Sequence, residues 1–308
     1  KPFDPRLISV VPPAVAKAAM ESGVAQFPIK NWTKYKDELI ERSGGDNKLV
    51  RLMHGRAKIN PKRVVFAEAD QLTVLKAAQF VHDEGIAIPI LLGRKETINL
   101  LMEELDFDAD IEIIDPKENS QAMIDEYASI YWKKEERKGL TLLASKKLMR
   151  ERNYFGAMMV NSGDADALIT GYSKSYPNVV KPILKLIGLD DGATRIATTN
   201  LLITERGPLF LSDTSINIDP SAADLAKIAQ MTATTVKMFG IEPVIAMTSY
   251  SNFGSSKDIS ATKVRNAVKY LHRSYPNLIV DGELQTDFAL NNEMRNDIFP
   301  FSKLSSKK

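Results

Sequence analysis

The first part of the chain alternates between short apolar runs and longer amphipathic segments. Residues 62–69 (KRVVFAEA) form an apolar run typical of a buried strand, and residues 70–85 then repeat apolar side chains at helical spacing. The same order of strand and helix continues through residues 87–93, 97–105, 111–115 and 120–156. Such alternation predicts a mainly parallel sheet with helices on both faces.

A second half is predicted to begin near Ser162, with a strand at residues 167–170 that ends on Gly171. Its centre breaks the alternation. Residues 195–215 (RIATTNLLITERGPLFLSDTS) contain two apolar runs joined by a polar turn at 205–208. This pattern predicts an antiparallel hairpin inserted into an α/β fold.

The pattern after the hairpin returns to helix and strand. Asp219 is the expected N-cap of a helix that has Pro220 in its first turn and ends at Gly240. A strand (PVIAMTS), a polar turn, a helix at about 261–275 and a last strand (NLIVDGE) follow.

The N-terminal part predicts short helices followed by a polar linker at residues 43–47. We therefore expect three parts: residues 1–46, a first α/β lobe at 47–161 and a second at 162–308. With 308 residues, the chain is long enough for such a two-lobed arrangement.

Composition narrows the possible partners and the compartment. A net charge of +2 gives no general electrostatic case for nucleic acid, and no apolar run approaches the roughly 20 residues of a membrane span. The chain has no cysteine, which excludes disulfides and thiol nucleophiles and fits a reducing compartment. We expect a cytoplasmic protein that binds neither nucleic acid nor membrane.

The segment from Ser249 to Lys257 is the strongest candidate for chemistry. A strand, a small polar loop and a helix form the usual framework of an anion site, in which backbone amides and hydroxyls approach a phosphate closely. Lys257 or Lys263 would add positive charge near the helix start. An ordinary connection between strand and helix fits the segment equally well.

Two further strand ends carry polar residues. Thr170 and Gly171 end one strand, although the preceding Asp164 and Asp166 are more typical of a solvated turn. Asp281 and Glu283 end another, where carboxylates serve acid/base chemistry or accept hydrogen bonds from neighbouring loops, the second role being slightly favoured.

Other signals do not support a cofactor or metal within the chain. The three histidines are scattered without metal-ligand spacing, and residues 106–112 (DFDADIE) lack the glycine and the closing glutamate of a calcium loop. No glycine-rich dinucleotide fingerprint or Walker loop occurs. We expect no metal site here.

A series of segments resembles the phosphate acetyltransferase family, roughly over residues 60–302. In order, these are KRVVFAEA, GIAIPILLG, RKGLT, YFGAMMVNSGDADALITG, SDTSINIDPSAADLA, SYSNFGSS and IVDGELQTDFAL. The resemblance implies a two-lobed αβα fold like that of isocitrate dehydrogenase, a cleft between the lobes and a dimer through the second lobe. For free-standing members it implies acetyl transfer between coenzyme A and phosphate without a metal.

The resemblance also suggests which residues line that cleft, with acetyl-CoA, coenzyme A or phosphate as ligand. Arg137 would neutralise phosphate charge, and Thr170 and Gly171 would stand opposite the second-lobe loop. The loop residues are Ser249, Ser251, Asn252, Gly254, Ser255 and Ser256. Lys263, Asp281 and Glu283 complete the candidates, and no catalytic residue is assigned.

The first residues resemble a different family. KPFDPR and VAKAAMESGVA are similar to the end of the catalytic region of bacterial malic enzymes of the long, hybrid type. Residues 1–46 would then be the tail of that region and its linker. This implies a parent polypeptide that oxidatively decarboxylates malate to pyruvate, with NADP and a divalent metal outside this chain.

Two positions depart from the acetyltransferase pattern. Thr73 stands where the family has an arginine, and Tyr172, Ser173 and Lys174 replace a small residue, a hydrophobic one and histidine. An anion-binding charge is lost and the pocket is reshaped. We therefore expect an acetyl-CoA-binding regulatory and oligomerisation domain. The alternatives are an active phosphate acetyltransferase and a purely architectural dimerisation domain.

Overall fold

The computed structural model describes residues 7–32, 34–35, 38–39, 48–118, 120–189, 193–204 and 206–304. Its contacts divide the chain into two compact units, Lys1–Met53 and His54–Lys308. Helix α1 (Leu7–Glu21) belongs to the first unit and confirms the expected helical N-terminal segment. The predicted linker at 43–47 lies outside the described residues, and α3 (Lys48–Ile59) follows it.

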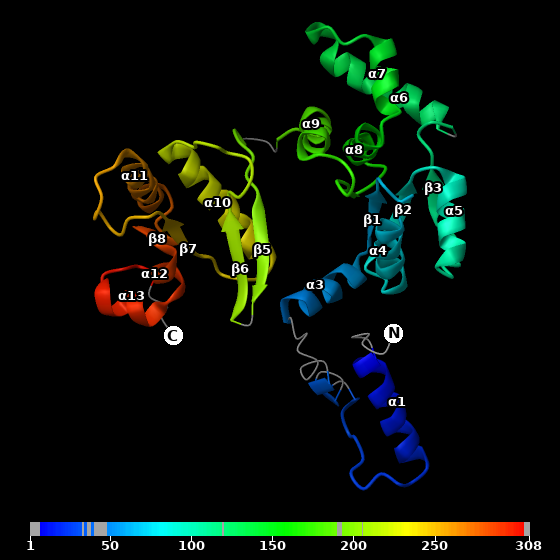
Figure 1. Cartoon of the computed structure of the whole chain (residues 1–308), viewed down its shortest axis with the longest axis horizontal. Helices are drawn as coiled ribbons and strands as arrows, with labels where there is room; N and C mark the ends of the chain where they lie inside the picture. The colour runs from blue at the N-terminus through cyan, green and yellow to red at the C-terminus, as the bar shows by residue number, and fades with distance from the viewer. Residues whose placement is uncertain are drawn as a thin grey trace. The chain divides into compact units, whose positions relative to one another are not determined.

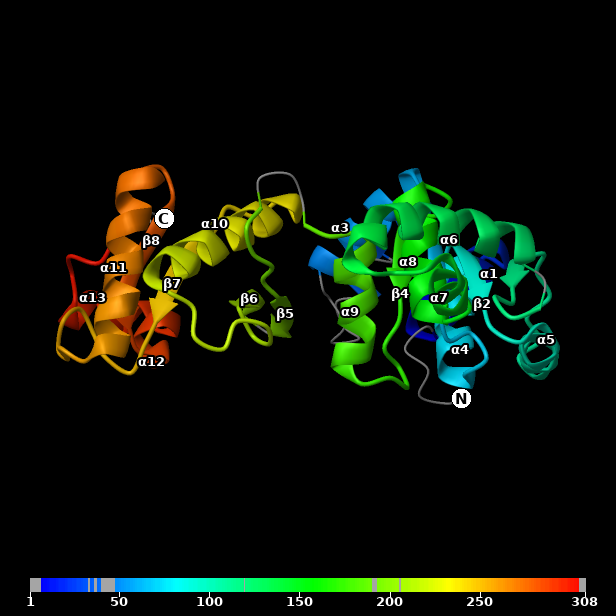
Figure 2. The same cartoon turned by 90° about the horizontal axis from the view of Figure 1, so that it is seen from above.

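A parallel sheet organises the first half of the second unit. Its four strands are ordered β3-β2-β1-β4, and every neighbouring pair is parallel. Figures 1 and 2 show this sheet among its helices. The strands are β1 (Lys62–Phe66), β2 (Ala87–Leu92), β3 (Glu112–Ile114) and β4 (Ala167–Ile169). The helices are α4 (Leu72–Asp83), α5 (Lys95–Glu104), α6 (Gln121–Glu135), α7 (Leu142–Met149), α8 (Arg152–Ser162) and α9 (Tyr176–Leu186).

Apolar side chains leave this sheet on both faces. Phe66 and Leu91 pack in a cluster with side chains of α4 and α5. Their neighbours Val65 and Leu92 pack in a second cluster with side chains of α6 and α8. Because successive strand residues point to opposite faces, a continuous apolar run is required where both faces are buried. The predicted αβα layering is confirmed.

The second half contains two two-stranded sheets. The antiparallel pair β5 (Thr199–Thr204) and β6 (Gly207–Ser212) confirms the predicted hairpin, with Leu201 opposite Phe210. The other pair, β7 (Val244–Thr248) and β8 (Ile279–Leu284), is parallel. Helices α10 (Ala222–Met238) and α11 (Ile259–Ser274) share a core with this pair, and α12 (Thr286–Leu290) and α13 (Asn292–Ile298) follow. No helix in the described segments is long and apolar enough to cross a membrane.

The start of α10 differs from the sequence expectation. Ser221, and not Asp219, is the N-cap: its hydroxyl accepts a hydrogen bond from the Asp224 amide at 3.2 Å, and the Asp224 carboxylate accepts one from the Ser221 amide at 2.9 Å. Such a reciprocal capping box satisfies two free amides, which a lone Asp219 cap would not. Asp219 instead forms an ion pair with Lys263 at 2.5 Å. The predicted end at Gly240 is confirmed by its positive φ of 75°.

The capping box gives a stability prediction. Substitution Ser221→Ala removes the acceptor for the Asp224 amide, so we expect the free energy of unfolding to fall by about 1 kcal/mol. Urea titration of both proteins would measure the change. The control Ser221→Asn retains a good N-cap and should stay close to the wild type; equal losses in the two variants would contradict the capping role.

Candidate functional site

The loop between β7 and α11 lies at the carboxyl end of a parallel strand, the usual position of ligand sites in α/β folds. It runs from Ser249 to Asp258. The Ser249 amide donates to the Leu284 carbonyl at 3.0 Å, which holds the beginning of the loop on β8. Asp258 caps α11 by accepting from the Ser260 amide at 2.8 Å. Both ends of the loop are therefore fixed to regular structure.

A buried carboxylate organises the loop from the neighbouring strand. The side chain of Glu283, on β8, is fully buried, and Oε1 accepts hydrogen bonds from the Ser251 hydroxyl at 3.0 Å and the Gly254 amide at 2.8 Å. The Arg265 guanidinium, on α11, donates to both carboxylate oxygens at 2.7 and 2.9 Å. Burial alone would raise the pKa of Glu283, but these donors outweigh it and the pKa is lowered.

The serines and the asparagine bond to one another and to the next strand end. The Ser251 hydroxyl lies 3.0 Å from that of Ser255 and accepts from the Ser256 amide at 3.0 Å. Asn252 and Gln285 form a reciprocal pair: the Asn252 amide group donates at 2.8 Å, and the Gln285 backbone amide donates back at 2.7 Å. The loop polar groups thus have internal partners.

The tip of the loop has an unusual backbone. Phe253 has φ of 43° and Gly254 has φ of 97°. A positive φ is uncommon for a bulky residue such as phenylalanine and points to a functional or packing constraint. Here the Phe253 ring packs against Phe299 and Phe301, with centroids 5.0 Å apart in each case, and its amide donates to the Glu283 carbonyl at 2.7 Å. Gly254 meets the conformational demand without strain.

The second group of candidates lies at the end of β4. Three successive amides, those of Gly171, Tyr172 and Ser173, donate to the Glu68 carboxylate at 2.9, 2.9 and 2.8 Å. The Ser173 hydroxyl donates to the same carboxylate, and the Thr170 hydroxyl donates to Asn153 at 2.7 Å. Burial would raise the pKa of Glu68, but these donors lower it. Successive amides of this kind form a concave anion site, which Glu68 fills from within the chain.

Thr73 and Tyr172, two residues that differ from the family pattern, contact each other beside this group. The Tyr172 hydroxyl donates to the Thr73 hydroxyl at 3.3 Å. Nearby, Arg152 forms a two-pronged ion pair with Asp70 at 2.7 and 2.6 Å, which lowers the pKa of that carboxyl. Glu68, Asp70 and Arg152 line a small cavity of about 250 Å³ together with Lys117, Arg150 and Lys174.

Among the described residues, three predicted site residues form no hydrogen bond or ion pair with either loop. Arg137 is exposed on the 3-10 turn Glu136–Lys138 that follows α6. The Lys263 ammonium pairs with Asp219. Asp281 accepts from the Lys303 amide at 2.7 Å and supports the C-terminal segment. Asp164 and Asp166 are held by Arg63, which donates to the Asp164 carbonyl and to the Asp166 carboxylate.

Three residues around the loops were not among the sequence candidates: Glu68, Asn153 and Arg265. Each acts by a contact with a residue distant in sequence, such as Glu68 with Gly171. The only local signal is their position, after a strand end for Glu68 and within the first two turns of a helix for Asn153 and Arg265. Among the described residues, no group of three or more histidine, aspartate or glutamate side chains could hold a metal ion.

Residues 48–308 match the family model described as "Phosphate acetyl/butaryl transferase". The chain belongs to this family. A phosphotransacetylase structure from Streptococcus pyogenes superposes with a TM-score of 0.74 at 34% identity, covering 84% of this chain and 80% of that one. A phosphate acetyltransferase of Thermoanaerobacterium thermosaccharolyticum is 34% identical over 84% of this chain and 80% of its own length. The resemblance and the fold class expected from the sequence are confirmed.

The malic enzyme resemblance is confirmed as well. The NADP-dependent malic enzyme of Haemophilus influenzae is 38% identical over 99% of this chain, and that of Salmonella typhimurium is 39% identical over the same share. The chain spans 41% and 40% of the lengths of these relatives. The match therefore extends to residues before Lys48, which the acetyltransferase family model does not cover.

The Glu283 network gives a prediction about pH. Substitution Glu283→Gln removes the charged partner of Arg265, so we expect the free energy of unfolding at neutral pH to fall by about 2 kcal/mol. Since the folded-state pKa of Glu283 is lowered, its contribution is present above the ordinary glutamate pKa of about 4.3 and is lost as the pH falls through the folded-state value. The difference in free energy of unfolding between wild type and Glu283→Gln should therefore narrow as the pH falls through the folded-state pKa.

Urea unfolding of wild type and variant from neutral to acid pH would measure this difference. The control Glu293→Gln removes an exposed carboxylate outside this network and should not reproduce the loss of stability at neutral pH. A constant difference between wild type and Glu283→Gln across the acid range would contradict the assigned ionisation.

Proposed function

We propose that this chain is an acetyl-CoA-binding regulatory and oligomerisation domain of an NADP-dependent malic enzyme. The β7–α11 loop carries the proposal: it combines four serines, an asparagine and a glycine at a strand carboxyl end. The internal network around Glu283 holds this loop in one conformation. A fixed loop binds a ligand with less loss of conformational entropy than a mobile one.

The same geometry supports binding over catalysis. Acetyl transfer needs donors aimed at the developing oxyanion and a base for the coenzyme thiol. At the β4 end the successive amides are occupied by Glu68, and Thr73 contributes a hydroxyl bonded to Tyr172 where the family has an arginine. Loss of one such donor costs about a hundredfold or more in rate. A ligand-binding role tolerates these changes better than a catalytic role does.

Regulation follows if acetyl-CoA binds two states of the parent enzyme with different affinity. The ligand then shifts their populations, and malate decarboxylation in the attached domain changes by the same coupling. In this proposal the malate, NADP and divalent-metal sites belong to the remaining part of the parent polypeptide, which works in the cytoplasm. The second half of this chain would form a dimer contact, as expected for the family.

Binding can be tested directly by titrating acetyl-CoA calorimetrically into this chain. We expect one saturable site per subunit. Substitution Gly254→Ala forces a side chain onto a residue with φ of 97°, so we expect it to weaken binding at least about tenfold.

The control Gly207→Ala changes another glycine of positive φ, in the β5–β6 turn, and should leave the affinity unchanged. Release of free thiol from acetyl-CoA in the presence of phosphate would instead identify an active acetyltransferase. Absence of any binding would leave only an architectural role.

The regulatory part is tested on the parent enzyme. We expect acetyl-CoA, at concentrations that saturate the domain, to change the KM or kcat for malate, and the Gly254→Ala enzyme to respond only at higher concentration. Steady-state NADPH formation gives the readout. Unchanged malate kinetics with saturated acetyl-CoA binding would reject regulation while leaving the binding site intact.

A further inference from the structure

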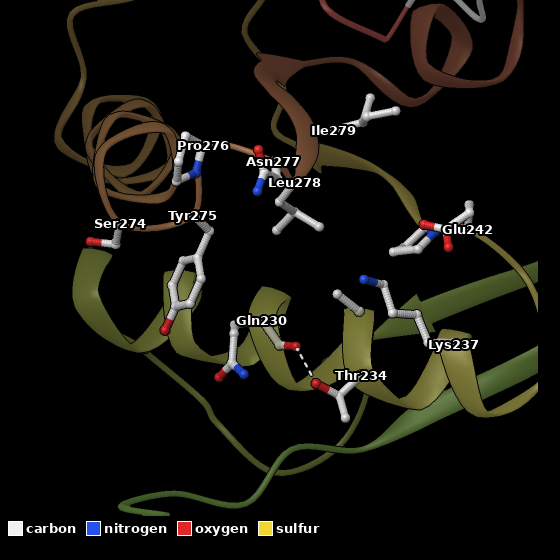
Figure 3. A pocket seen from close by; sticks show the side chains of 12 residues that line it. Gln230, Thr234, Lys237, Glu242, Ser274, Tyr275, Pro276, Asn277, Leu278 and Ile279 are labelled. Carbon is white, nitrogen blue, oxygen red and sulfur yellow. Dashed lines mark hydrogen bonds between the residues drawn. The ribbon is translucent and has the colours of Figure 1, made fainter.

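A pocket lies at the amino ends of β7 and β8, at the opposite end of these strands from the candidate loop. One wall is the face of α10 that carries Gln230 and Lys237. The other walls are Glu242, just before β7, and the connection from α11 to β8, which includes Tyr275 and Asn277. Figure 3 shows these side chains around the opening. We call it the α10–α11 pocket; its volume is about 380 Å³.

The pocket contains a buried acceptor without a partner. The side-chain oxygen Oε1 of Gln230 is buried and receives no hydrogen bond from the described residues, whereas its backbone carbonyl accepts from the Thr234 hydroxyl at 3.2 Å. In Figure 3 the Gln230 side chain and the Tyr275 ring lie at one end of the opening, away from Lys237 and Glu242. More than about 90% of buried polar groups in native proteins are hydrogen-bonded. The site therefore fits a donor that comes from outside the chain.

The other end of the pocket carries one charge of each sign. Lys237 and Glu242 are both exposed, and neither forms an ion pair or hydrogen bond within the described part of the chain. In Figure 3 the two charged groups lie at the same side of the opening. The floor between the polar ends is apolar, with Ala233 and Leu278. Polar groups at both ends of an apolar floor are typical of small-molecule sites.

We propose that the α10–α11 pocket binds a free α-amino acid with a hydrogen-bond-donating side chain. The ligand carboxylate pairs with Lys237 and its ammonium with Glu242. The ligand side chain crosses the apolar floor and donates to Oε1 of Gln230. Gln230 and Lys237 lie seven residues apart on one helix face, about 10 Å along the axis, so a ligand with an extended side chain reaches both.

This ligand class satisfies all the unpartnered groups together. An anion alone would leave Gln230 and Glu242 without a donor, and a simple amine would leave Lys237 without an acceptor. The pocket is separated from the β7–α11 loop by the length of the strands, because it lies at their amino ends. No residue of the loop lines the pocket.

The test uses the whole chain and three probes: L-glutamine, L-alanine and glutaramic acid. L-glutamine has both charges and the side-chain donor, L-alanine lacks the long side chain, and glutaramic acid lacks the ammonium. Calorimetric titration up to about 10 mM, roughly ten times a Kd of 1 mM, should give saturable binding that is tightest for L-glutamine. Absence of a saturable response to L-glutamine would overturn the proposal.

Two variants separate the ends of the pocket. Lys237→Gln should weaken L-glutamine and L-alanine alike, at least about tenfold. Gln230→Leu should weaken L-glutamine but not L-alanine, and should raise the Tm of the free protein because a buried unpartnered oxygen is removed. The control Lys269→Gln changes an exposed lysine of α11 outside the pocket and should have no effect. Equal L-glutamine affinity in the wild type and both pocket variants would place any binding elsewhere and reject the site.

Discussion

A buried carboxylate at the end of one parallel strand holds the loop that follows the neighbouring strand, and both candidate groups depend on this contact. Glu283 of β8 holds the loop after β7, and Glu68, two residues beyond β1, holds the loop after β4. Burying a charge is costly unless donors compensate it. Each carboxylate has at least four such donors, so each loop is tied to the strand that carries its carboxylate.

The same contact limits what the two loops can do with an anionic ligand. At the end of β4 the three successive amides already bind Glu68, so an anion that used them would have to displace that carboxylate. At the end of β7 the Gly254 amide donates to the Glu283 carboxylate, and the Phe253 amide donates to the Glu283 backbone carbonyl. The Ser255 amide, for comparison, donates to the Asn252 carbonyl within the turn. A ligand of this loop would therefore bind either by exposed hydroxyls or by rearranging the loop, and rearrangement would couple binding to conformation.

The sequence predicted the parts of the fold that depend on local pattern. The apolar runs at Val65–Phe66 and Leu91–Leu92 indicated strands buried on both faces, and the turn before Gly207 indicated the hairpin. The cap of α10 was wrong because Asp219 and Ser221 both precede the helix and only the capping box with Asp224 distinguishes them. The Glu68 contact was missed because it joins residues 103 positions apart, and no local periodicity encodes such a pair.

Hydrogen-bond satisfaction distinguishes the β7–α11 loop from the α10–α11 pocket. In the loop, a ligand group that took the place of an internal hydrogen-bond partner would gain one hydrogen bond and lose another, so the net change in free energy would be small unless charge or buried apolar surface added to it. In the pocket, Oε1 of Gln230 is already removed from water without a partner, so a donor there gains a bond and loses none. Under the proposed function, affinity in the loop would therefore come from the many contacts of a large ligand. A small ligand with a few well-placed donors is sufficient in the pocket.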